Sequence, residues 1–233
     1  MRDMRILAVF SHPDDELGCV GTLSKHAKRG DDVMLVWTTY GELASHFVDA
    51  GAEDVRRIRH EHGRHVALRL GAEYRFFDMG DSRIKADREE KLELARFYAK
   101  FKPDVVITWS DAHAHPDHQA TSRIAVDAVT FARIPKIINE RSAEQLTPHR
   151  KPVRVYQYAD PSCNRPVVHV DITGEIDLAV ELFAFYQGFY GWEYSPEQFR
   201  ANRATFGREC GVKFAEKLQV RGAFAPAVQY LGA

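Results

Sequence analysis

Residues 4–16 have the sequence MRILAVFSHPDDE, an apolar run followed directly by histidine, proline and three acidic residues. A short apolar run of this kind is typical of a buried β-strand. Folding does not require a His and two adjacent Asp at the end of such a strand. A second segment of the same kind is DVVITWSDAHAHPDH at 104–118. Because His and Asp are common ligands of divalent metals, the two segments together raise the hypothesis of a metal site.

The first 134 residues alternate between strand-like and helix-like segments. Strands are expected at 4–10, 32–39, 73–77 and 104–109, and helices at 17–29, 53–70, 89–101 and 119–132. This pattern predicts an α/β, Rossmann-like fold with a mostly parallel sheet and helices on both faces. In a doubly wound sheet of order 3-2-1-4, the first and fourth strands are neighbours, and the loops that follow them form one crevice. The two segments rich in His and Asp are therefore expected to meet.

The remaining residues predict a C-terminal part of strands and helices. A long loop is expected at 135–152, strands at 153–158 and 166–172, and helices at 175–190 and 200–218. No linker-like composition interrupts the chain. Residues 1–233 are therefore interpreted as a single domain, with a Rossmann-like core at 1–134 and C-terminal strands and helices at 135–233. The aromatic residues between 183 and 192 are expected to pack in the core.

Composition and charge narrow the class of protein. The chain has 32 Lys and Arg against 33 Asp and Glu, a net charge of -1 that argues against a nucleic-acid binder. A hydrophobic content of 45% supports a folded core. The three cysteines are far apart and form no CxxC, which favours a reducing compartment. Without a signal-peptide pattern or a stretch of transmembrane length, a cytoplasmic protein is expected.

The two segments offer the ligands of a catalytic zinc site. His12, Asp15 and His118 would supply two imidazoles and one carboxylate, and three protein ligands leave a position for water. Asp14 would lie beside the metal without binding it, where a carboxylate can take a proton from the bound water. His115 would face the same cavity and could stabilise an oxyanion or protonate a leaving amine.

The same residues resemble the motifs of a known family. Ser11–Glu16 resembles the AHPDDE signature of the PIG-L (LmbE-like) zinc deacetylases, and His115–His118 resembles their HPDH motif. Weaker similarities link Thr39–Glu42 to a T-x-G-E motif, Arg59–His62 to R-x-E, and Gly211–Glu216 to G-x-x-Y-A-E. The resemblance thus extends over most of the chain.

The resemblance implies a Rossmann-like, metal-dependent hydrolase. Its reaction would remove the N-acetyl group of an N-acetylglucosamine-type amino-sugar conjugate, with metal-bound water attacking the amide. One Zn²⁺ per chain, or another divalent transition metal, would bind to residues that match the family's ligands by position: His12, Asp15 and His118. By the same correspondence, Asp14 resembles the general base and His115 the acid or oxyanion residue.

Two further residues are candidates for binding the substrate. Arg59 could clamp a hydroxyl or a phosphate, although a helix ion pair is an equally simple role for it. His113 occupies the place of a Tyr that polarises the acetyl carbonyl in some family members. The segment after Asp171–Thr173 also departs from the family, being aromatic where many members are rich in Lys. These departures predict that the substrate is a small-molecule amino-sugar conjugate with a bulky or apolar aglycone. The sequence leaves the oligomeric state open, and a homo-oligomer is possible.

Other interpretations of the motifs compete with this hypothesis. A metal-dependent phosphohydrolase would be expected to have an Asp-x-Asp loop after the first strand, and Asp14-Asp15 lacks that spacing. A non-catalytic sugar-binding relative would keep the motifs without turnover. Either motif alone also fits a helix N-terminus with acidic first-turn residues. Glu16 and Asp117 are therefore expected to have structural or supporting roles, and His62 is expected to be a core histidine.

Overall fold

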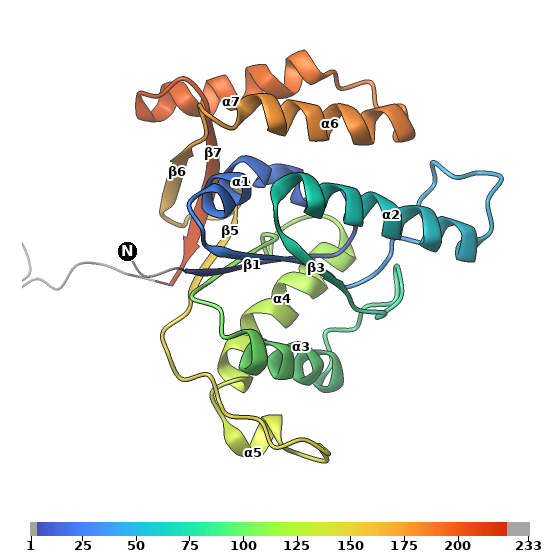
Figure 1. The fold of residues 1–233 in the computed structure, drawn as a ribbon, viewed down its shortest axis with the longest axis vertical. Helices are drawn as coiled ribbons and strands as arrows, with labels where there is room; N and C mark the ends of the chain where they lie inside the picture. Colours follow the sequence, from blue (N-terminus) through green and yellow to red (C-terminus); the bar gives the residue numbers. More distant parts are fainter. Residues whose placement is uncertain (1–3, 223–233) are drawn as a thin grey trace, which may run out of the picture.

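Seven strands form one sheet in the computed structural model, which describes residues 4–222. The sheet has the order β3-β2-β1-β4-β5-β7-β6 (Figure 1). Its strands are β1 (Arg5–Phe10), β2 (Asp32–Trp37), β3 (Glu73–Phe76), β4 (Val105–Thr108), β5 (Arg154–Tyr158), β6 (Val167–Asp171) and β7 (Ala215–Arg221). The first five are parallel, and β7 runs antiparallel to both of its neighbours. The predicted order 3-2-1-4 is therefore confirmed.

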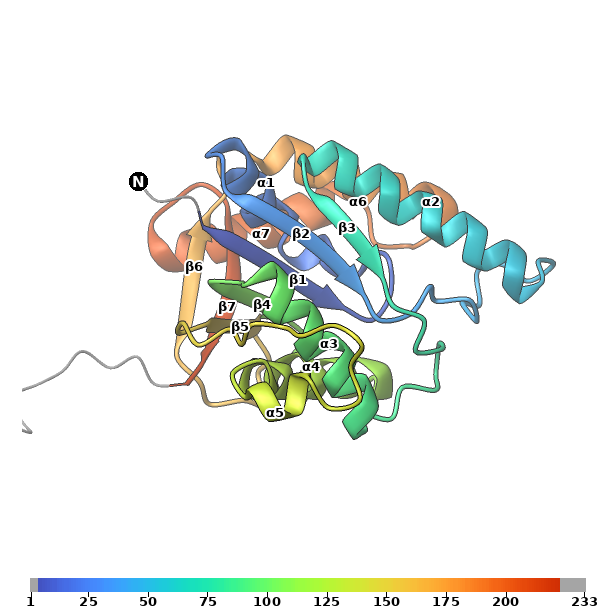
Figure 2. The same ribbon diagram turned by 60° about the horizontal axis from the view of Figure 1, so that its bottom comes forward.

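Helices cover both faces of the sheet, as predicted (Figures 1 and 2). One face carries α1 (Val20–Lys28), α2 (Ala52–Leu70), α6 (Ile176–Tyr190) and α7 (Pro196–Cys210). The other face carries α3 (Arg88–Phe101), α4 (Pro116–Phe131) and the short α5 (Pro135–Ile138). A right-handed crossover between parallel strands places helices in this way.

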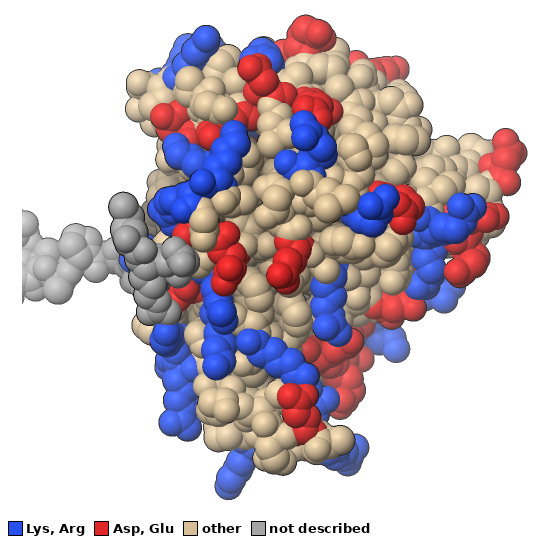
Figure 3. Space-filling view, viewed as in Figure 1, with Lys and Arg blue, Asp and Glu red and all other residues tan. Residues whose placement is uncertain are grey.

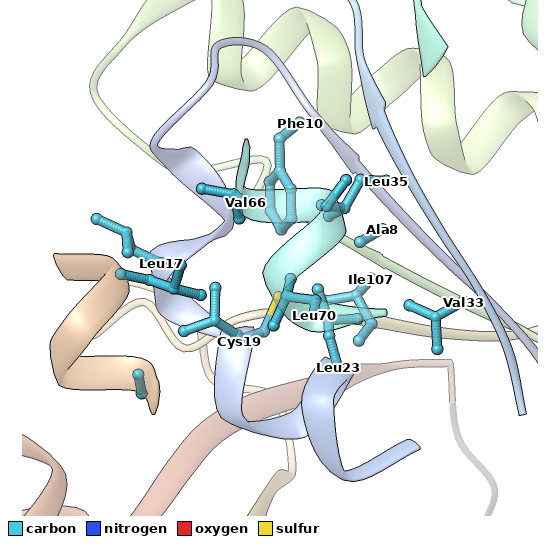
Figure 4. Close-up of a cluster of buried hydrophobic side chains, with 14 of the residues drawn as sticks. Ala8, Phe10, Leu17, Cys19, Leu23, Val33, Leu35, Val66, Leu70 and Ile107 are labelled. Atoms are coloured by element: carbon cyan, nitrogen blue, oxygen red, sulfur yellow. The ribbon is translucent and has the colours of Figure 1, made fainter. Parts of the chain in front are cut away.

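The central strand β1 is buried on both faces, which explains its uninterrupted apolar sequence. Ile6, Ala8 and Phe10 belong to the core under α1 and α2. Leu7 and Val9 belong to the core under α3 and α4. Figure 4 shows the first of these cores, in which Ala8 and Phe10 lie among side chains from neighbouring strands and helices.

The prediction of a helix at 200–218 is wrong in its second half. The helix α7 ends at Cys210, Gly211 follows with a φ of +79°, and Ala215–Arg221 forms strand β7. A Cβ atom on Gly207 would lie 2.6 Å from the carbonyl oxygen of Val212, so the chain folds back closely against its own helix. Only a residue without a side chain allows this approach. Two smaller differences are the short α5 inside the expected loop and a 3₁₀ turn at Asp15–Gly18 before α1.

Strand β7 is connected to helix α1 by a buried carboxylate. Glu216 Oε1 accepts a hydrogen bond from the amide of Gly21 at 2.8 Å. Its Oε2 accepts from the amide and the hydroxyl of Thr22 at 2.7 and 2.6 Å. The first amides of a helix have no partner within the helix and favour negative charge. This contact gives the late Gly211–Glu216 motif a structural role.

Charge is distributed evenly over the visible face of the molecule. Lys and Arg side chains are interspersed with Asp and Glu in Figure 3, in keeping with the balanced composition. Within residues 4–222, none of the helices is long and apolar enough to cross a membrane. Because a single sheet runs through both the core and the C-terminal part, we propose that the chain forms one domain.

We expect Glu216→Gln to lower the free energy of unfolding by about 1–3 kcal/mol, because the amide group offers one acceptor where the carboxylate offers two. Urea unfolding followed by circular dichroism measures this change. Glu53→Gln is the matched control, since that side chain is 92% exposed and should change stability by less than about 0.5 kcal/mol. Equal stability of the two variants would contradict the role assigned to Glu216.

Candidate metal centre

The loops that leave β1 and β4 meet at the carboxyl edge of the sheet and bring the predicted ligands together. Asp15 lies between the two imidazoles, with Oδ1 3.3 Å from His118 Nε2 and Oδ2 3.6 Å from His12 Nδ1. The candidate ligand atoms of these three residues all lie within 4.8 Å of one another. Two imidazoles and a carboxylate in this arrangement can hold a divalent metal ion.

Asp15 is fixed by donors from both loops. Its Oδ2 accepts hydrogen bonds from the amides of Ser11 at 3.0 Å and His12 at 2.9 Å, and from Trp109 Nε1 at 2.9 Å. Burial alone would raise the pKa of Asp15, but the hydrogen bond to His118, the nearby His12 and the indole N–H outweigh it and lower the pKa. The carboxylate is therefore ionised and held in one orientation.

His12 is oriented by two further carboxylates. Its Nε2 lies 3.2 Å from Asp117 Oδ2 and 3.3 Å from Asp81 Oδ1. Because ionised carboxylates only accept hydrogen bonds, Nε2 carries a proton and Nδ1 is the nitrogen that faces Asp15. Burial alone would lower the pKa of His12, but Asp117, Asp81 and Asp15 raise it to about 10. A metal at Nδ1 therefore binds in competition with a proton.

Asp81 is the site residue that the sequence analysis missed. It follows β3, and its Oδ2 accepts from the amide of Leu43 at 2.9 Å. Asp117 accepts from the amide of Ser82 at 2.8 Å, so these two carboxylates join three loops around His12. No motif marks Asp81. The sequence feature that could have indicated Asp81 is its position after a parallel strand, because the carboxyl end of that strand lies at the same edge of the sheet as the loops of His12 and His118.

Asp81 and Asp117 form a second cluster with His12 that could also hold a metal. A neutral imidazole has one unprotonated nitrogen, so His12 can complete only one of the two clusters. The first cluster has two imidazoles, and the second has one. Nitrogen-rich sites suit zinc, whereas carboxylate-rich sites suit harder ions, which favours Asp81 and Asp117 as partners of His12.

The neighbouring aspartates point to different partners. Asp14 has a φ of 110°, an unusual conformation for a residue with a side chain. Its amide donates to Glu16 Oε2 at 3.0 Å, and its Oδ2 lies 3.2 Å from Arg59 Nη1. Burial raises the pKa of Asp14 to about 6, although the charge of Arg59 opposes this rise. Asp14 thus lies beside the cluster without joining it.

Glu16 is buried and helps to hold Asp14 in place. Its Oε2 accepts from Trp37 Nε1 at 3.0 Å in addition to the Asp14 amide, and its Oε1 accepts from the Tyr186 hydroxyl at 2.7 Å. Burial raises the pKa of Glu16 to about 7. These contacts are structural, as the sequence analysis expected, and they stabilise the unusual backbone conformation of the residue that faces Arg59.

Arg59 is buried and held by three partners. Besides Asp14, its guanidinium donates to the Tyr190 hydroxyl at 2.6 Å and to the Tyr40 carbonyl at 3.2 Å. A Cβ atom on Gly41 would lie 2.6 Å from Arg59 Nη2, which explains the glycine after β2. The Tyr190 hydroxyl also lies 3.1 Å from Nδ1 of His62, a buried histidine whose pKa burial lowers to about 4.

His115 begins helix α4 and stacks on the ring of His118, with ring centroids 4.5 Å apart. Its Nδ1 accepts from the amide of Asp117 at 3.2 Å. Because a backbone amide can only donate, Nδ1 is unprotonated and the proton of the neutral ring lies on Nε2. Burial and the nearby His118 lower the pKa of His115, which favours this neutral form.

These residues line a cavity of about 370 Å³. Its wall contains His12, Asp14, Asp15, Arg59, Asp81, Ser82, His115 and His118, and a loop after β2 adds Gly41, Leu43, Ala44, Ser45 and His46. His113 is not among the described residues that line it, and its ring lies against Trp109 and His118. The aromatic segment of α6 packs mainly in the core, where Phe183, Tyr186 and Tyr190 are buried.

Comparisons with known proteins identify the family of this chain. Residues 7–129 match the family model PIG-L, GlcNAc-PI de-N-acetylase. The chain is 24% identical over 232 residues to diacetylchitobiose deacetylase of Thermococcus kodakarensis, covering 96% of this chain and 84% of that protein. It is 28% identical over 233 residues to 4-oxalmesaconate hydratase of Pseudomonas putida, covering 91% of this chain and 84% of that protein.

The fold is also shared with a solved structure. N,N'-diacetylchitobiose deacetylase from Pyrococcus horikoshii, complexed with its inhibitor MPG, superposes with a TM-score of 0.84 at 23% identity. The superposition covers 96% of this chain and 87% of that one. Since the family model matches more than half of the 233 residues, this chain belongs to the PIG-L family of deacetylases, hydrolases that act on amide bonds.

Proposed function

We propose that this protein is a zinc-dependent hydrolase that removes the N-acetyl group from an N-acetylglucosamine-type amino-sugar conjugate. The observation that carries the proposal is the convergence of His12, Asp15 and His118 on one cavity, beside a carboxylate, Asp14, that is held by Arg59. The donor set fits zinc, because it combines two imidazole nitrogens with one ionised carboxylate. Bound zinc would supply Lewis-acid activation of water and of the amide carbonyl.

The chain provides a general base and an oxyanion donor for amide hydrolysis. Asp14 lines the cavity and is held by Arg59, so its carboxylate can accept a proton from water as the general base. His115 lines the same cavity and holds its proton on Nε2, from which it can donate a hydrogen bond to the oxyanion formed at the amide carbon. The proton that Asp14 takes from water can then pass to the departing amine. Each transfer of this kind contributes roughly 10²–10⁴ to a rate.

Arg59 and the loop after β2 are the proposed substrate contacts. Arg59 is rigid because Asp14, Tyr190 and Tyr40 hold it, and a fixed guanidinium can donate to a sugar hydroxyl at low entropic cost. Leu43 is 54% exposed and lines the cavity, where it provides an apolar surface for an aglycone. The relative from Thermococcus kodakarensis is named for a disaccharide substrate, which accords with a small amino-sugar conjugate here.

We expect the protein to release free amine from N-acetylglucosamine conjugates. The kcat/KM for an aryl N-acetylglucosaminide should exceed that for free N-acetylglucosamine by at least about tenfold, because contacts with the aglycone can stabilise the transition state. The comparison uses zinc-loaded protein with diacetylchitobiose, the aryl glycoside and the free sugar. Faster turnover of the free sugar would contradict the proposed contacts with the aglycone. No turnover of any of the three compounds would contradict the proposed deacetylase activity.

A hydratase is the second candidate function. The observation in its favour is the 28% identity with 4-oxalmesaconate hydratase over 91% of this chain. Both reactions need an activated water and a positioned proton carrier, so the same cavity can serve either. The same preparation is therefore assayed with 4-oxalmesaconate. Hydration of this compound without release of amine from any amino sugar would favour the hydratase.

We expect about one zinc ion per chain after expression in zinc-supplemented medium, because His12 can complete only one of the two clusters found among residues 4–222. His118→Ala should abolish this stoichiometry. Metal analysis by mass spectrometry measures it, and His60→Ala, a half-buried histidine on α2 outside the cluster, is the matched control. Wild-type protein without metal under these conditions would contradict the proposed site.

Substitutions of the two adjacent aspartates should have different effects on metal content and activity. Asp15→Ala should lose metal and activity together, because its carboxylate lies between both imidazoles. Asp14→Asn should keep the metal and lose at least roughly a hundredfold in kcat, the scale of a lost general base. Metal content and kcat are measured on the same samples. Equal metal loss in both variants would show that their roles are misassigned.

A further inference from the structure

The metal ligand His118 contacts a second histidine that lies outside the cavity. Nδ1 of His118 lies 3.0 Å from Nδ1 of His113. The same nitrogen of His113 also accepts a hydrogen bond from the amide of His115 at 3.2 Å. His113 therefore uses one ring nitrogen for two contacts, one with the backbone and one with a proposed ligand.

These contacts determine which nitrogen of His118 carries the proton. The His115 amide can only donate, so Nδ1 of His113 is unprotonated and acts as an acceptor. The contact between the two rings then requires Nδ1–H of His118 as the donor. Nε2 of His118 lies 3.3 Å from Asp15 Oδ1, and a metal bound between these two atoms replaces the proton of their hydrogen bond. With the other proton of His118 held on Nδ1, Nε2 is then the ligand nitrogen.

We propose that His113 is a positioning residue that fixes the Nδ1–H tautomer of His118 and thereby presents its Nε2 to the metal. The inference rests on the metal site of the proposed function, but not on the identity of the substrate. It differs from the substrate contact expected for His113 from the sequence, and it agrees with the position of His113 outside the cavity wall. Partners of this kind orient metal-bound histidines in other proteins.

The surroundings of His113 hold it rigidly enough for this role. Its ring lies 4.4 Å from the ring of Trp109, which stacks on His118 at 3.9 Å and donates to Asp15. Its carbonyl accepts from Gln119 Nε2 at 2.7 Å, which fastens the loop to the first turn of α4. His113, Trp109 and His118 thus form one packed group behind the metal ligands.

The test compares two substitutions of His113. His113→Phe keeps a ring against Trp109 but removes the acceptor, whereas His113→Asn places an amide oxygen near the position of Nδ1. Zinc affinity is measured by competition with a chromogenic chelator, without substrate. We expect His113→Phe to weaken zinc binding by roughly 10- to 100-fold and His113→Asn to stay within about threefold of wild type. His60→Phe is the control and should leave the affinity unchanged.

The outcomes separate positioning from substrate binding. With unchanged zinc affinity in His113→Phe and a raised KM at saturating zinc, His113 would be a substrate contact and the proposal would be overturned. Equal losses in both His113 variants would also overturn it, because the acceptor would not be the cause. If His113→Phe fails to fold, long-range ¹⁵N–¹H NMR of the zinc-loaded wild type decides, and a proton on Nε2 of His118 refutes the proposal. Since the zinc affinities and the NMR spectra are measured without substrate, failure of the deacetylase proposal would leave those results unaffected.

Discussion

The carboxylate of Asp15 is the interaction on which the candidate site depends. Its Oδ2 accepts from two amides of its own loop and from the indole of Trp109, while its Oδ1 faces His118. Trp109 follows β4, and the loop of Asp15 follows β1. The pairing of these parallel strands, with Val9 opposite Thr108, therefore sets the distance between the two imidazoles. A change in strand register would move one half of the metal centre away from the other.

The separation of Asp14 from Asp15 depends on backbone geometry that is unfavourable by itself. A positive φ at a residue with a side chain costs on the order of 1–3 kcal/mol. The Asp14 amide is held by the buried Glu16 and its carboxylate by Arg59, so hydrogen bonds at both ends offset this cost. Two adjacent acidic residues consequently serve different partners. Conformational strain at this point is informative because it lies beside the proposed chemistry.

The sequence was sufficient for the order of the first four strands and for the meeting of the two motifs, because hydrophobic periodicity indicates the strands and the doubly wound pattern gives their order. It was insufficient where position depends on distant contacts. Strand β7 was assigned to a helix, since the turn depends on the close approach at Gly207. Asp81 belongs to no motif and reaches His12 only through the fold. The hydrogen-bond partners that determine which ring nitrogen of a histidine is protonated likewise cannot be predicted from the order of residues in the sequence.

The two imidazoles of the cluster have different hydrogen-bond partners, and this difference affects their basicity. His12 donates Nε2–H to carboxylates and presents Nδ1, whereas His118, if His113 acts as proposed, donates Nδ1–H to a neutral ring and presents Nε2. A carboxylate partner raises the basicity of a ligating imidazole more than a neutral partner does. In the proposed site, His12 would therefore be the stronger donor to a bound ion. A carboxylate in place of His113 would add a third negative charge behind the ligands and reduce the Lewis acidity on which amide hydrolysis depends.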